Sequence, residues 1–184
     1  MAKQISELTE LTGNLDGDEE FFVVDDPGGS PEAKRISADN LFRGSKAAGQ
    51  IYCQSGASSQ SLSAGGWTKV TQFTAIGEGV NCTPDLGGNR ITIPNNGYYL
   101  FLFNASFEGN AAVQHTLRFR WGSTGLGESQ AFADGLGTGN PVNVSGSCIY
   151  HAEDAEQNLI LEVMAGTSST FVLIDGSLIA VRLF

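Results

Sequence analysis

The sequence predicts an all-β fold, an antiparallel sandwich that carries a short and mostly irregular N-terminal arm. Glycine accounts for 24 of the 184 residues, nearly double the usual share of about 7 %, which favours many tight turns. Several runs alternate apolar and polar residues at the two-residue period of a strand, and no long helical period occurs. Turn signals separate these runs at the short spacing that is typical of sandwiches.

Residues 1–46 form the predicted arm, which we interpret as an attachment segment. Its β-type run comprises Phe21, Phe22, Val23 and Val24, and a strong turn signal follows at residues 25–31. Lys34, Arg35 and Ile36 are expected to pair back as a second short strand. Two such strands cannot bury a core, so we expect the arm to become ordered against a neighbouring protein.

The arm also resembles a pattern found at the N-termini of bacteriophage structural proteins. The residues that carry the resemblance are Ile5-Ser6-Glu7-Leu8-Thr9, the acidic stretch Asp16 to Glu20, Phe22-Val23-Val24-Asp25 and Lys34-Arg35-Ile36-Ser37-Ala38-Asp39-Asn40-Leu41. In such proteins the segment is an attachment module. The resemblance therefore implies that Phe21–Val24 and Lys34–Ile36 anchor the chain to another virion protein.

Residues 47–184 form the predicted β domain. The expected strands cover residues 49–54, 67–75, 89–93, 98–108, 116–121, 142–151, 158–164 and 171–184. Residues 55–66 are expected to form a Ser/Gly/Ala loop, and residues 122–141 a long glycine-rich connection. In the strand over 116–121, Leu117, Phe119 and Trp121 are expected to point inward and Arg118 and Arg120 outward.

The run over 98–108 is the longest expected strand, and it is apolar on both faces. Strand alternation places Tyr99, Phe101, Phe103 and Phe107 on one face, and Leu100 with Leu102 on the other. A strand that is apolar on both faces is buried on both, within the domain or between subunits. The predicted core or trimer-interface residues are Tyr98, Tyr99, Leu100, Phe101, Leu102, Phe103 and Phe107.

The β domain resembles the C1q/TNF-like jelly roll. The carrying residues are Ile91-Thr92-Ile93-Pro94-Asn95-Asn96-Gly97-Tyr98-Tyr99-Leu100-Phe101, supported by Trp67-Thr68-Lys69-Val70, Asn158 to Val163 and Gly176 to Leu183. That family forms compact trimers, and trimeric knobs of this kind occur on phage fibres. The resemblance therefore implies a homotrimer built by residues 47–184.

The charge distribution excludes two classes of partner. The net charge is −10, and residues 1–46 and residues 47–184 each carry ten acidic and five basic side chains. Because the β domain lacks a basic cluster, we expect no nucleic-acid binding and no attraction to anionic membranes. No apolar run approaches the length of a membrane span, and the first residues lack the apolar run of a signal peptide.

The sequence predicts no enzyme, no cofactor and no metal site. Gly-x-Ser-x-Gly is absent, and no His/Cys ligand spacing is present. His115 is expected just before a strand, at a solvated position. Glu153, Asp154 and Glu156 suit a solvated turn, with a Ca²⁺ site as the alternative. Cys53, Cys82 and Cys148 are expected to be reduced and partly buried.

These observations favour a trimeric capsid decoration or head-fibre protein of a bacteriophage, anchored by residues 1–46. The expected location is the virion, after assembly in the host cytoplasm. The alternative is a short tail fibre whose knob binds a glycan or protein on the host surface. The absence of a coiled-coil shaft favours the first reading, since receptor-binding fibres usually need reach.

Overall fold

The computed structural model describes residues 20–25, 32–37, 47–54, 58–94, 96–153 and 157–183. The chain divides into two units, Met1–Gly44 and Ser45–Phe184. The first contains strands β1 (Glu20–Asp25) and β2 (Glu32–Ser37). They pair in antiparallel register, with Phe21 opposite Ile36 and Val23 opposite Lys34. The predicted hairpin is confirmed at the level of the backbone, whereas its docking on another protein stays a prediction.

The second unit is built almost entirely of strands. They are β3 (Ala48–Cys53), β4 (Gln60–Leu62), β5 (Thr68–Lys69), β6 (Ala75–Val80), β7 (Thr83–Asp85), β8 (Arg90–Ile93), β9 (Gly97–Gly109), β10 (Gln114–Trp121), β11 (Thr124–Gly125), β12 (Ala131–Asp134), β13 (Val142–Ala152), β14 (Gln157–Ala165) and β15 (Ser169–Arg182). A 3-10 turn, η2 (Gly127–Ser129), precedes β12.

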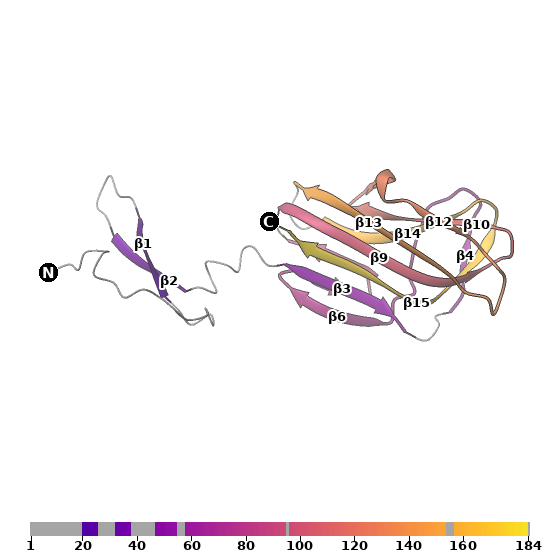
Figure 1. Ribbon diagram of the computed structural model, residues 1–184, viewed down its shortest axis with the longest axis horizontal. Coiled ribbons are helices and arrows are strands. Elements are labelled where there is room, and N and C mark those ends of the chain that lie inside the picture. Colours follow the sequence, from indigo (N-terminus) through magenta and orange to yellow (C-terminus); the bar gives the residue numbers. More distant parts are fainter. Residues whose placement is uncertain are drawn as a thin grey trace. The chain divides into compact units, whose positions relative to one another are not determined.

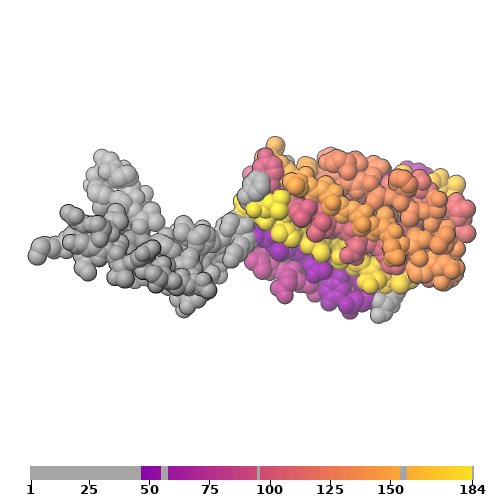
Figure 2. Space-filling model, viewed as in Figure 1, coloured from indigo at the N-terminus to yellow at the C-terminus, as the bar shows by residue number. Residues whose placement is uncertain are grey.

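These strands form two antiparallel sheets. The six-stranded sheet has the order β13-β9-β15-β3-β6, and β4 pairs with β15. Figure 1 shows the five strands of that order side by side. The chain's last strand, β15, lies in the middle of the sheet and crosses the face seen in Figure 2 as a yellow band. The seven-stranded sheet has the order β11-β10-β14-β8-β7, with β12 on β10 and β5 on β14.

An aromatic core fills the space between the sheets. Phe101 and Phe119 are fully buried and come from opposite sheets, and their ring centroids lie 5.9 Å apart. Phe103 meets Phe119 edge-on at 5.1 Å, and Trp121 stacks on Phe101 at 5.9 Å. The inward residues of β9 and β10 are the ones that strand alternation predicted, so both strands have the expected phase.

The strand expected over residues 67–75 is wrong. Only β5 and the beginning of β6 fall in it, and the chain between them crosses from one sheet to the other. The buried side chain of Gln72 explains the interruption. Its amide nitrogen donates to the Phe171 carbonyl at 3.0 Å, and its oxygen accepts from the Leu173 N–H at 2.7 Å. A side-chain amide thus takes the place of a peptide group beside β15.

The connection expected over residues 122–141 is also wrong, because it contains β11, η2 and β12. Strand β12 pairs with β10, with Ala133 opposite His115 and Phe132 opposite Thr116. Ala131 and Ala133 are half-buried, while Phe132 is 68 % exposed. The four residues between Gln130 and Gly135 carry too little alternation to indicate a strand. Strands β4 and β7 have three residues each and were missed for the same reason.

His115 is buried, not solvated as the sequence suggested. It lies within β10, is fully buried, and packs against Phe107 at a centroid distance of 5.3 Å. Its Nε2 lies 3.0 Å from the Ser169 hydroxyl. Burial lowers the pKa of His115 below its ordinary value of 6.5, an effect that the carboxylate of Asp134 partly opposes.

The buried histidine predicts a pH-dependent stability. The folded state holds the neutral imidazole, so the unfolded state binds the proton more readily. The stability contributed by His115 is complete above pH 6.5 and is lost as the pH falls from there toward the lower pKa of the folded state. His115→Gln should therefore have a lower melting temperature than the wild type at pH 8. Its melting temperature should fall less than that of the wild type between pH 8 and pH 5. Equal losses in both proteins would exclude His115 as the cause.

Candidate functional site

The outer face of the six-stranded sheet brings part of the predicted interface residues to the surface. Strand β9 lies between β13 and β15 in this sheet. Its residues divide into two sets: Tyr99, Phe101, Phe103 and Phe107 point into the core and are at most 3 % exposed, whereas Tyr98, Leu100 and Leu102 point outward. Only the outward set is available to a partner.

Cross-strand register extends this outward set into one continuous row. Ile149 lies opposite Leu100, and Leu100 lies opposite Val181. Val181 lies opposite Ala48, which lies opposite Val80. This apolar row crosses β13, β9, β15, β3 and β6 in turn, and Ile149 and Val80 at its two ends are 64 % and 47 % exposed. Contiguous apolar surface of this kind marks an interaction site more often than scattered single residues do.

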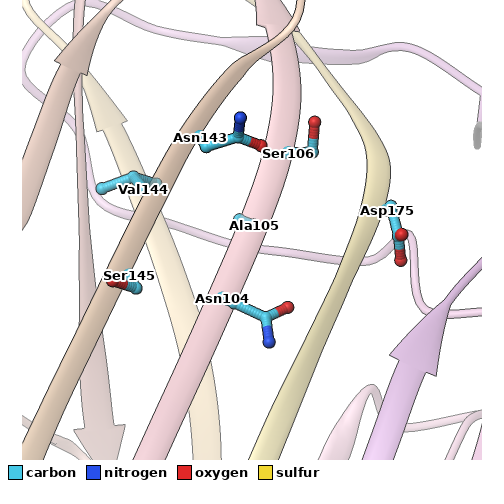
Figure 3. Close-up of a pocket in the computed structure, with 7 residues that line it drawn as sticks. All are labelled: Asn104, Ala105, Ser106, Asn143, Val144, Ser145 and Asp175. Atoms are coloured by element: carbon cyan, nitrogen blue, oxygen red, sulfur yellow. The ribbon is translucent and has the colours of Figure 1, made fainter.

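The same face becomes polar farther along the strands. Past Leu102 the outward positions are Asn104 and Ser106 on β9, with Asn143 on β13 and Asp175 on β15. Figure 3 shows these side chains around a shallow hollow of about 270 Å³. A register shift between Leu173 and Asp175 bends β15 at this point. The face therefore has an apolar half and a polar half.

The outer face of the seven-stranded sheet has a different character. The Glu162 side chain is 4 % exposed, and its carboxylate accepts from Arg118 at 2.9 Å and from Arg120 at 3.1 Å. The Arg118 guanidinium also lies 3.8 Å from the centroid of the Trp67 ring. Glu162 thus pairs with both arginines within the subunit. The outer face of the seven-stranded sheet therefore carries ion pairs at its centre, where the six-stranded sheet carries the apolar row.

The three cysteine thiols lie in the interior of the jelly roll. Cys53, Cys82 and Cys148 are free and buried, as the sequence predicted. Burial raises the pKa of Cys82 and of Cys148 to about 11, so both thiols stay protonated at neutral pH.

Metal ligands and membrane spans were also searched for among the described residues. There, no three His, Cys, Asp or Glu side chains gather as a metal site would require. Asp154 and Glu156 of the acidic turn lie outside the described ranges. Within those ranges, no helix has the length and apolar character needed to cross a bilayer.

Solved structures identify the arrangement of the two sheets. The globular domain of zebrafish complement 1qA protein superposes with a TM-score of 0.54 at 15 % identity, covering 76 % of this chain and 98 % of that one. Eiger TNF from S. frugiperda superposes with a TM-score of 0.55 at 13 % identity, covering 76 % and 93 %. The fold is a C1q/TNF-like jelly roll. The resemblance that residues 91–101 carry is thus confirmed for the fold.

Comparison by sequence adds nothing to this likeness: no protein-family model and no curated protein matches the chain. Identities this low show the architecture of the jelly roll alone. What its outer faces bind is therefore argued from their own residues.

Proposed function

We propose that this chain is a bacteriophage virion protein, a trimeric capsid decoration or head-fibre protein that residues 1–46 anchor to the particle. The observation that carries the trimer is the apolar row, which runs across five strands of one sheet. The side chains at its two ends, Ile149 and Val80, are exposed in the single subunit. The resemblance of residues 5–41 to phage attachment modules supports the virion location. The β1–β2 hairpin supports the anchor.

Burial of the apolar row between subunits has a sound physical basis. Removing apolar surface from water contributes about 25 cal/mol per Å² to an assembly, and the entropy lost on association offsets part of that gain. The outer face of the jelly roll also places polar groups on one side of the row, so an interface there would combine apolar burial with hydrogen bonds. The compact trimers that the C1q/TNF resemblance implies would cover this face.

The trimer predicts a sedimentation mass of three subunits at micromolar concentration. Ile149→Asp combined with Val80→Asp should raise the dissociation constant more than a hundredfold, because two carboxylates per subunit would be buried without partners. Both positions are exposed in the single subunit, so the variant should keep the wild-type β spectrum by circular dichroism.

Two results would overturn this assembly. The first is a wild-type mass of one subunit. The second is dissociation by Phe132→Asp, on the other sheet, while the variant in the apolar row stays trimeric, since that would place the contact on the seven-stranded sheet.

The anchor predicts a loss of particle incorporation. Replacing Phe22 and Val24 with Asp should abolish incorporation and leave the thermal stability of residues 47–184 unchanged. A trimer presents three linked copies of a weak anchor, so weakening each copy lowers the overall affinity steeply. The measurement is the occupancy of the protein on purified particles. Normal occupancy of the double variant would mean that the jelly roll itself attaches.

A second candidate function is that of a short tail fibre whose knob binds a host-surface receptor. A cavity at the edge of the jelly roll favours it, since the lining mixes aromatic rings with hydrogen-bonding groups. Imaging of the intact particle distinguishes the two candidates by placing the protein on the head or on the tail.

A further inference from the structure

A cavity of about 410 Å³ opens at the edge of the jelly roll where β13 ends. It is formed by the end of β10, the turn into β11, the end of β13 and the first residue of β14. Its lining residues are Trp121, Gly122, Ser123, Thr124, Tyr150, His151, Glu153 and Gln157. The volume lies within the range of about 300–1,000 Å³ that is usual for small-molecule sites.

The apolar part of the lining is held rigidly by the core. Trp121 and Tyr150 come from opposite sheets, and their ring centroids lie 5.6 Å apart. Phe101 stacks on both rings, at 5.9 Å from Trp121 and 6.0 Å from Tyr150. Trp121 is only 6 % exposed, while Tyr150 is half-buried. The cavity therefore has a preformed aromatic wall, which lowers the entropy lost on binding.

The polar part combines donors and acceptors from separate strands. His151 stacks on Tyr98 with a centroid distance of 4.4 Å, and its Nδ1 lies 3.5 Å from a Glu153 carboxylate oxygen. Gly122 has φ +55°, and a Cβ there would lie 2.6 Å from the Gln157 amide oxygen. The left-handed φ at this position favours glycine in the turn beside Gln157. The Ser123 and Thr124 side chains add two hydroxyls.

This combination selects a class of ligand. Sugar hydroxyls both donate and accept hydrogen bonds, as the amide, imidazole and hydroxyl groups of the lining do. The C–H face of a sugar ring packs on an aromatic ring. The eight lining residues include no Lys or Arg, and Glu153 repels anions, so phosphates and acidic sugars are disfavoured.

We propose that this cavity binds a neutral saccharide, one pyranose ring of a larger glycan. Tyr150 and Trp121 would contact the ring face, and Gln157 with Glu153 would hold its hydroxyls. The inference deepens the second candidate function and rests on it, since a host glycan is the receptor that such a site would serve.

Tryptophan fluorescence of the full chain tests the proposal. The chain has two tryptophans, so Trp67→Phe leaves Trp121 in the cavity wall as the only indole. Titration with the methyl glycosides of glucose, galactose, mannose and N-acetylglucosamine should give a saturable change with at least one of them, with a millimolar Kd. Gln157→Ala and Glu153→Ala should each weaken that Kd about tenfold, through the loss of hydrogen bonds to the sugar.

Gln54→Ala is the matched control, because it removes an exposed amide outside this cavity and should leave the Kd unchanged. Glu153 is 80 % exposed, so its variant tests the site even if Gln157→Ala fails to fold. No saturable change with any glycoside, an unchanged Kd in both variants, or tighter binding of sialic acid would each overturn the proposal. If imaging places the protein on the tail at normal occupancy but the protein binds no sugar, the proposed saccharide site is rejected. The tail-fibre function is then kept.

Discussion

Phe103→Ala is expected to lower the free energy of unfolding by about 3–5 kcal/mol, through lost burial and the cavity that the ring leaves. Phe103 is 3 % exposed and packs edge-on against Phe119 of the opposite sheet. On its other side, the ring lies so close to Gly146 that a Cβ there would approach a ring carbon to 2.4 Å. The neighbouring β13 backbone cannot collapse into the space, so the full cost should appear. Denaturant unfolding measures it.

Phe132→Ala is the matched control for this prediction. It removes the same side chain from β12 of the other sheet, where the ring is 68 % exposed. The free energy of unfolding should change by no more than about 0.5 kcal/mol. Equal losses at the two positions would show that the described burial of β9 is wrong.

Glu162→Ala is expected to cost about 2–3 kcal/mol, because it leaves two guanidinium groups without their carboxylate. The Arg118 and Arg120 side chains are 19 % and 31 % exposed, so water replaces the lost partner only in part. Arg118 should then move away from Trp67, and the emission of Trp67 should shift along with the unfolding midpoint. Trp121→Phe isolates that signal.

Glu78→Ala serves as the control, since it removes the same charge from an exposed position on β6. It should change the free energy of unfolding by no more than about 0.5 kcal/mol. A comparable loss at Glu78 would mean that net charge, and not the pairing of Glu162, sets the stability.

Long strands were predictable from the sequence because alternation repeats often enough in them to be read. Strand β9 has 13 residues and β10 has eight, and their phases followed from Phe101, Phe103 and Phe119. Strand β12 has four residues, too few to establish a period. Residues 70–74 misled for another reason: Val70, Thr71 and Phe73 have strand propensity, and only the folded structure supplies the β15 backbone groups that Gln72 binds.

The candidate site was predictable only in part. The outward apolar residues of β9 followed from its own alternation. The row from Ile149 to Val80 depends on four registers, and those registers join residues up to 133 positions apart, as Ala48 and Val181 show. The cavity at the end of β13 combines residues from β10, β13 and β14, and single residues such as Gln157 carry no motif. Its one local signal was the glycine at position 122, just after an alternating strand.

The central place of β15 has a consequence for synthesis on the ribosome. This strand separates β9 from β3, so the six-stranded sheet cannot close until residue 182 has emerged. Until then β9 presents an unpaired edge along most of its length, the kind of edge that pairs with other nascent chains. Chaperone protection of the nascent chain should therefore last almost to the end of translation.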